Sequence, residues 1–208
     1  MPDYLGLGQG RGIHPYHHAK SEAIACIDML RWVRDYCYNH DSKWNGQLFL
    51  LGYSQGGHAT MAMHREIETY YPDEFIVSAS APLSEAYDIS GVQASVLESD
   101  MVYPSPGYLP FLLFAYLEVY GNLYDSIQQL LIEPYATTIP PFLDMTHGMG
   151  EIDDAMTDVS RDTIQPDIFS SYMADTNHLL RHALRDNDVY HWTPNARYVW
   201  HNVREICM

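Results

Sequence analysis

Apolar residues recur along this chain with two different spacings, which together predict alternating helices and strands. Over residues 20–38 they follow a three- and four-residue spacing, which indicates an amphipathic helix. Residues 48–51 form an unbroken apolar run, which predicts a parallel strand buried on both faces. A second helix should follow and end at about Tyr71, because Pro72 comes next, and residues 75–82 should form another strand. The apolar positions of the first helix are Ala23, Ile24, Ile27, Leu30 and Val33.

This order of helix, strand, helix and strand is typical of an α/β fold with a parallel sheet and right-handed crossovers. The pattern changes over residues 87–186, where prolines repeatedly interrupt helical stretches rich in Tyr and Leu. We expect one domain of residues 1–208, with this segment inserted as a mainly helical cap over the carboxyl ends of the strands. The apolar side chains of the cap could line a pocket for an acyl or aryl group, or form the cap's own core. Residues 196–201 predict a third strand.

The candidate chemistry lies where the first apolar run ends, in a Gly-x-Ser-x-Gly motif over residues 52–56. A serine hydroxyl is a weak nucleophile and has to project from a tight turn towards a base. Gly52 and Gly56 flank Ser54, and we expect a Cβ at either glycine to crowd the strand against the helix. The backbone N–H of Gln55, at the start of the helix, could face a developing oxyanion. The motif predicts Ser54 as nucleophile and Gln55 as oxyanion donor, with a strand-to-helix turn capped by serine as the alternative.

The charge of the chain excludes some classes of partner. Lys and Arg number 11 against 27 Asp and Glu, so the formal net charge is −16. Nucleic acids and anionic membranes are bound through basic patches, and neither is expected as a partner. No stretch approaches the ~20 apolar residues of a membrane span, and the sequence opens without the basic and apolar regions of a signal peptide.

Neither the cysteines nor the glycine-rich opening predicts a metal or cofactor. Cys26, Cys37 and Cys207 show no C-x-x-C spacing, and the first two are too far apart in one helix to form a disulfide. The glycines of residues 2–12 do not make a G-x-G-x-x-G followed directly by a helix, so a dinucleotide site is not expected. Nearby histidines without a carboxylate or Cys at ligand spacing favour a packed or flexible loop over a metal site. These are His14, His17 and His18.

Together the motif, the opening loop and the inserted segment resemble the α/β-hydrolases, specifically bacterial lipase- and esterase-like members with a helical cap. The resemblance spans nearly the whole chain. It implies a serine hydrolase that forms an acyl-enzyme on Ser54, with the Gln55 N–H as half of the oxyanion hole. The matching residues are Pro2-Asp3-Tyr4-Leu5-Gly6-Leu7-Gly8, then His17, Ala19, Ser21, Glu22 and Ala23, Gly52-Tyr53-Ser54-Gln55-Gly56-Gly57, Ser80-Ala81-Pro82, Tyr87-Asp88-Ile89-Ser90-Gly91, Pro134-Tyr135-Ala136, and Asn187 with Trp192 and Pro194.

The sequence departs from that family at both ends. The family has several strands before the opening loop, including the loop that donates the second oxyanion N–H. After the strand that matches residues 196–201 it has a catalytic Asp in a turn and then, some tens of residues later, a His. Here Arg204-Glu205 stands about where an Asp-Glu pair belongs, so Glu205 is the nearest candidate for the acid, and nothing fills the place of the His. We therefore expect a chain incomplete at both ends and, by itself, a very poor esterase. Secretion or export to the periplasm would follow if a signal peptide preceded it.

Other histidines could replace the missing base, although their positions favour packed or surface roles. His58 and His64 lie on the helix that follows Ser54, and His201 ends the third predicted strand, before the acid position. The candidates assigned to the cap are His147, His178, His182 and His191.

Three functions are compatible with these residues. The motif and the apolar cap favour hydrolysis of carboxylic esters, small or lipid-like, a reaction that needs no cofactor. The missing His favours a non-catalytic α/β-hydrolase-like fragment or binding protein. Amide or peptide hydrolysis on the same scaffold shares the acyl-enzyme chemistry and is the third possibility.

Overall fold

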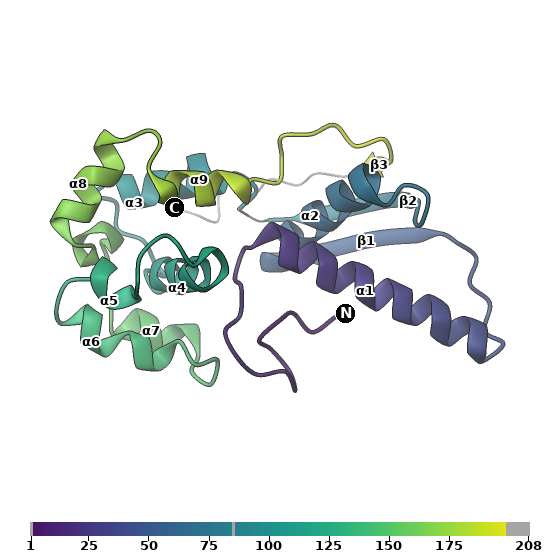
Figure 1. The fold of residues 1–208 in the computed structure, drawn as a ribbon, viewed down its shortest axis with the longest axis horizontal. Coiled ribbons are helices and arrows are strands. Elements are labelled where there is room, and N and C mark those ends of the chain that lie inside the picture. The colour runs from purple at the N-terminus through teal and green to yellow at the C-terminus, as the bar shows by residue number, and fades with distance from the viewer. Residues whose placement is uncertain (1, 85, 199–208) are drawn as a thin grey trace. The chain divides into compact units, whose positions relative to one another are not determined.

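The computed structural model describes residues 2–84 and 86–198, and the chain divides into two compact units (Figure 1). The first unit takes in Ala19–Tyr87 together with the residues before Leu5 and those after Asn187. The second unit takes in Leu5–His18 and Asp88–Asn187. The candidate motif over residues 52–56 therefore belongs to the first unit.

The first unit is built on a parallel sheet, as the sequence predicts. Its elements are α1 (Ala19–Asn39), β1 (Leu48–Tyr53), α2 (Gln55–Tyr70), β2 (Val77–Leu83) and β3 (Arg197–Tyr198). The strands pair in the order β1-β2-β3, and both pairs are parallel. In the register, Leu50 lies opposite Ser80, and Ser80 lies opposite Tyr198. The third strand begins one residue later than predicted, and the rest of that predicted strand lies outside the described residues.

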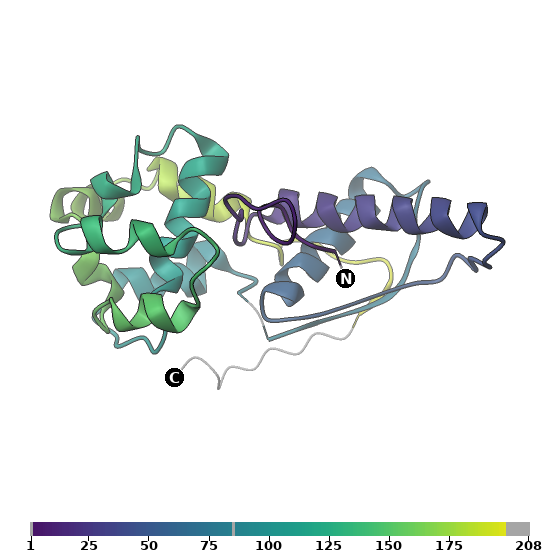
Figure 2. The same ribbon diagram turned by 90° about the horizontal axis from the view of Figure 1, so that it is seen from below.

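The core of the first unit lies between one face of the sheet and the two helices. Helix α2 packs on β1 and β2, and α1 packs against α2, so both helices lie on the same side of the strands (Figure 2). The buried stripe of α1 differs from the predicted one, because Ile24 and Val33 are only half-buried while Glu22 and Cys26 are buried. The buried residues of this core include Ala23, Ile27, Leu30, Leu48, Leu50, Met61, Ile67, Phe75, Val77 and Val189.

The prediction that β1 is buried on both faces is wrong. Leu48 and Leu50 are buried, but Phe49 is 66 % exposed and Leu51 74 % exposed. Side chains of successive strand residues point to opposite faces, and α1 and α2 cover only one of these faces. The other face of β1 therefore presents a row of large apolar side chains to solvent, which Tyr53 continues at 63 % exposed.

The second unit is a set of short helices. Prolines and glycines set several of their ends: Pro166 begins α8, and Gly121, in the left-handed region at φ 63°, ends α4. The elements are a π-helix η1 (Ile89–Gln93), α3 (Ala94–Glu98), α4 (Tyr108–Tyr120), α5 (Ile127–Leu130), α6 (Tyr135–Thr138), the 3₁₀ turn η2 (Pro140–Phe142), α7 (Met149–Asp154), the 3₁₀ turn η3 (Ser160–Thr163), α8 (Pro166–Ala174) and α9 (Leu179–Asp186).

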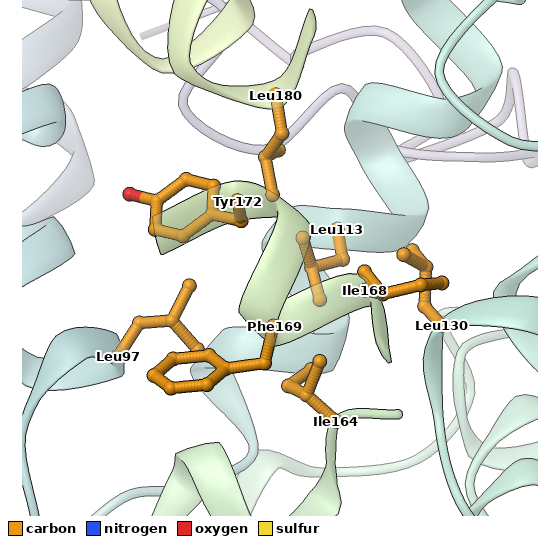
Figure 3. A pocket seen from close by; sticks show the side chains of 8 residues that line it. All are labelled: Leu97, Leu113, Leu130, Ile164, Ile168, Phe169, Tyr172 and Leu180. Carbon is orange, nitrogen blue, oxygen red and sulfur yellow. The ribbon is translucent and has the colours of Figure 1, made fainter. Parts of the chain in front are cut away.

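Apolar side chains of the second unit surround a void rather than a substrate-sized pocket. The void has a volume of about 10 Å³, which is about the least that one water molecule needs. Figure 3 shows its lining side chains converging from several helices. They are Leu97, Leu113, Leu130, Ile164, Ile168, Phe169, Tyr172 and Leu180. Of the two roles left open by the sequence, these residues therefore have the role of a core for the helical unit.

In the part of the chain that the structure describes, no helix combines the length and the apolar character that crossing a bilayer requires. Cys26 and Cys37 are free thiols, and burial raises the pKa of Cys26 to about 12. Cys26 is therefore held as an unreactive thiol inside the core. Cys207 lies outside the described residues.

Candidate active site

Ser54 occupies a strained turn between β1 and α2. Its backbone has φ 53° and ψ −133°, a conformation that costs a residue with a Cβ about 1–3 kcal/mol. The Ser54 N–H donates to the carbonyl oxygen of Leu83, at the end of β2, over 3.1 Å, and the Gly57 N–H donates to the Ser54 carbonyl oxygen over 2.6 Å. These bonds fix the turn from both sides. The side chain of Ser54 is exposed, as the sequence-based expectation of a projecting turn requires.

The two glycines of the motif have different roles. A Cβ on Gly52 would lie 1.8 Å from the carbonyl oxygen of Gly56 and 2.5 Å from the Thr60 hydroxyl, so only glycine fits there. A Cβ on Gly56 would meet nothing within 4 Å. The expectation of crowding is therefore confirmed for Gly52 and wrong for Gly56. The backbone of Gly56 closely approaches Gly52, but a Cβ on Gly56 itself would point into open space.

Gln55 is the first residue of α2, where backbone N–H groups have no carbonyl partner within the helix. Together with the positive end of the helix dipole, this makes the start of α2 a favourable place for negative charge. The side chain of Gln55 has a separate partner: its Nε2 donates to Glu22 Oε1, in the first turn of α1, over 2.8 Å.

Glu22 also binds His58, and this buried acid is a feature that sequence reasoning missed. Its Oε2 lies 2.6 Å from His58 Nδ1, and both side chains are buried, at 1 % and 0 % exposed. A signal was present in the pattern, since Glu22 stands one turn before Cys26 on the buried stripe of α1. An acid at such a position needs a partner, but a helical pattern alone does not show what that partner is.

The two histidines of α2 are buried and hydrogen-bonded to neighbouring side chains. Their spacing from Ser54 favours such a packed position over a catalytic one. His58 is bound to Glu22, and His64 lies between Ser80 and Glu68, with its Nδ1 2.8 Å from Ser80 Oγ and its Nε2 3.0 Å from Glu68 Oε1. Among the described residues the Ser54 hydroxyl makes no hydrogen bond, so no described histidine is held against it as a base. His201 and Glu205 lie outside the described residues.

The other candidate histidines take varied positions in their own units. His14 and His17 are buried in the second unit, where His14 Nδ1 lies 3.0 Å from the Leu5 carbonyl oxygen. His178 is the N-cap of α9 and accepts a hydrogen bond from the Leu180 N–H. His147 binds Asp144 at the surface, 3.0 Å away.

Glu68 ties the last described segment to α2. It accepts backbone hydrogen bonds from Asn195 over 2.9 Å and from Ala196 over 3.0 Å, directly before β3. Burial raises the pKa of Glu68, but these bonds and the contact with His64 outweigh it and hold the pKa below its usual range. Burial also lowers the pKa of His64, and its bond to Glu68 offsets this only in part.

Acidification from pH 7 to pH 5 should destabilise the first unit through His64. With a folded pKa below the unfolded value of about 6.5, the unfolded chain binds the proton first as pH falls, so the free energy of unfolding decreases. One such group contributes at most about 1.4 kcal/mol per pH unit. Glu68 contributes to the pH dependence of stability only at lower pH. Its pKa is lowered in the folded protein, so its carboxylate stabilises the fold above about pH 4.5, and this stabilisation is lost as the pH falls below that value.

Urea unfolding of His64→Gln at pH 7 and pH 5 measures this effect, with the exposed His40→Gln as control. We expect a flatter dependence of stability on pH for His64→Gln and an unchanged one for His40→Gln. Equal slopes in all three proteins would show that His64 is not the group that titrates.

Three features define the class of protein to which this fold belongs. They are a parallel sheet, a serine at positive φ where a strand turns into a helix, and a helical unit that follows β2 in the chain. The chain has the α/β-hydrolase fold of lipases and esterases, of which it spans a part. The rice cell wall degrading esterase LipA from Xanthomonas oryzae is similar to it, with 30 % identity, a TM-score of 0.83, and coverage of 95 % of this chain and 53 % of that one. Lipase A from Candida antarctica in its closed state is 16 % identical, with a TM-score of 0.65, and the match covers 90 % of this chain and 43 % of that one.

The chain thus spans about half the length of the solved structures that it matches. No protein-family model and no curated protein matches it.

Proposed function

We propose that this chain carries the nucleophile and one oxyanion donor of a serine hydrolase that acts on carboxylic esters. The observation that supports this most is the conformation of Ser54, whose positive φ projects its exposed hydroxyl at the start of α2. A strained backbone at an exposed serine is unfavourable for stability, and a role in chemistry would account for it. The likeness to an esterase and a lipase supports the same reaction class.

The proposed reaction follows from the order of these groups. The Ser54 Oγ attacks the ester carbonyl carbon and loses its proton to a base, and the carbonyl oxygen becomes an oxyanion that accepts from the Gln55 N–H. Collapse of this intermediate breaks the bond to the alcohol, which leaves with a proton. A water molecule then attacks the acyl-serine, releases the acid and restores the Ser54 hydroxyl. No step needs a cofactor.

The substrate is proposed as a small ester or a lipid-like ester. The helical unit of Asp88–Asn187 is proposed as the cap of this site, a role inferred from its place in the chain after β2. Because the side chains around the small void pack as a core, we propose that other apolar residues, on the outside of this unit, bind the acyl group.

Covalent labelling with a fluorophosphonate tests the proposal. The probe should modify Ser54 in preference to the other serines, because orientation and the oxyanion donor alone give about 10³- to 10⁴-fold acceleration over water even without a complete triad. Mass spectrometry of the digested protein identifies the modified residue. The matched variant Ser54→Ala, which keeps the Cβ, should lose this adduct and keep its melting temperature.

Two outcomes would contradict the proposal. Folded protein without an adduct on Ser54 would support the alternative of a non-catalytic α/β-hydrolase-like protein. Adducts spread evenly over surface serines would show that the Ser54 turn gives no activation. If Ser54 is labelled, comparing p-nitrophenyl ester with p-nitroanilide substrates distinguishes ester from amide hydrolysis.

A further inference from the structure

The acid on α1 is attached to both ends of the first turn of α2. Glu22 Oε1 accepts from Gln55 Nε2 over 2.8 Å, and its Oε2 lies 2.6 Å from His58 Nδ1. Gln55 and His58 are three positions apart, so they lie on the same face of α2. One carboxylate thus clamps the first turn of the helix that begins directly after Ser54.

Stability alone is a poor explanation for a carboxylate at this position. Glu22 is 1 % exposed and stands on the stripe of α1 that buries Ala23, Cys26 and Ile27. An apolar residue would extend this stripe, and replacing a buried polar pair by well-packed apolar residues is often neutral or stabilising. A buried carboxylate with two directed partners instead specifies geometry, because its hydrogen bonds are satisfied in one arrangement only.

The turn that Glu22 clamps is the one where geometry matters most for the proposed chemistry. Helix ends fray, and the peptide plane that carries the Gln55 N–H is held on its carbonyl side by the bond from the Gly57 N–H, at the end of the helix where backbone bonding is least regular. An oxyanion donor contributes to catalysis only when it is already aimed at the place where the charge develops. The bond between Glu22 and the side chain of Gln55 restricts rotation of the same residue whose N–H is the proposed donor.

We propose that Glu22 is a positioning residue of the Ser54 turn. Glu22 holds the Gln55 N–H in place through the Gln55 side chain, and it anchors the first turn of α2 through His58. This inference rests on the proposed function of Ser54 and Gln55. Glu22 itself does not touch the substrate.

Three variants test the role. Glu22→Ala removes both hydrogen bonds, and Gln55→Ala removes one of them but keeps the backbone N–H and the contact between Glu22 and His58. Glu22→Gln keeps the shape: its amide oxygen can accept from Gln55, and its amide nitrogen can donate to His58. The double variant Glu22→Ala/Gln55→Ala completes a double-mutant cycle. If Glu22 and Gln55 act through the same hydrogen bond, the effects of the two single substitutions will not add.

The first measurement is the rate of fluorophosphonate labelling at Ser54 per folded molecule. Because outer residues that orient a site typically contribute about 10- to 100-fold, we expect losses of that size in Glu22→Ala and in Gln55→Ala. The double variant should be no slower than the slower single variant, and Glu22→Gln should stay within about threefold of wild type. Unchanged labelling in folded Glu22→Ala, independent effects in the cycle, or Glu22→Gln as slow as Glu22→Ala would each overturn the inference.

The second measurement separates this inference from the proposed function. Amide hydrogen exchange in Glu22→Ala should accelerate at residues 54–58 while the rest of α1, β1 and β2 keeps its protection. Uniform acceleration across the first unit would mean that Glu22 serves stability only, and would overturn the inference. If wild-type Ser54 is not labelled at all, the proposed function fails, and the exchange pattern still decides whether Glu22 orders the turn.

Discussion

The 208-residue chain by itself is expected to hydrolyse p-nitrophenyl butyrate about 10⁴- to 10⁶-fold more slowly than an ordinary enzyme that turns over at ~10 s⁻¹. The reason is the proton on Ser54. Among the described residues no histidine is hydrogen-bonded to the Ser54 hydroxyl, and without a base the hydroxyl stays protonated near neutral pH. Release of nitrophenolate by purified, monomeric protein measures the rate, with Ser54→Ala as the background.

Imidazole added to the solution should restore part of the missing rate, because a general base contributes roughly 10²- to 10⁴-fold. Imidazole also cleaves the ester directly, so the quantity to compare is the difference between wild type and Ser54→Ala at each imidazole concentration. Turnover near the ordinary rate without imidazole, abolished in Ser54→Ala, would show that a base of this chain already reaches Ser54.

Substitution of the first glycine of the motif should disrupt the fold around Ser54. A Cβ at position 52 would lie 1.8 Å from the Gly56 carbonyl oxygen, so Gly52→Ala forces β1 and the start of α2 apart. Steric conflicts with the backbone belong to the severe class of substitutions, and we expect a loss of about 4 kcal/mol in the free energy of unfolding. For a chain of this size that corresponds to a fall of about 8–16 °C in melting temperature.

The second glycine of the motif supplies the matched control. Gly56 lies inside α2 with open space at its Cβ, so Gly56→Ala removes flexibility from the unfolded chain and should raise stability by about 0.5–1 kcal/mol. Thermal unfolding of the two variants measures the contrast. Similar destabilisation by both substitutions would mean that the motif needs glycine for another reason than the approach of Gly56 to Gly52.

The sequence pattern predicts the elements of the first unit well, because their signals are local. Spacing of three and four residues marks α1, the apolar run marks β1, and Pro72 marks the end of α2. The strained turn at Ser54 follows from the motif and its setting between strand and helix. What such patterns do not contain is which faces are covered. A strand with one buried face and a strand with two buried faces can have the same apolar sequence. Phe49 belongs to such an apolar run, yet its side chain is exposed.

Roles that depend on tertiary contacts were equally beyond the pattern. The motif contains two glycines, but only the approach of α2 to β1 shows that Gly52 is the one without room for a Cβ. Glu22 belongs to a helix where acids are common on the solvent side, and its burial becomes evident only when α1 packs on α2. The partners of His64 come from β2 and from its own helix, a combination that spacing from Ser54 does not suggest.

The uncovered face of β1 also bears on how copies of this chain meet in solution. Phe49, Leu51 and Tyr53 form an apolar row on a strand that, within the described residues, pairs only with β2. Such a row beside an unpaired edge attracts other chains, whereas a formal net charge of −16 repels them. The repulsion is screened beyond about 8 Å at physiological ionic strength, while the apolar attraction is not. Ionic strength therefore sets the balance between charge repulsion of whole chains and their association through β1. A dilute buffer of low salt concentration is expected to keep the protein monomeric.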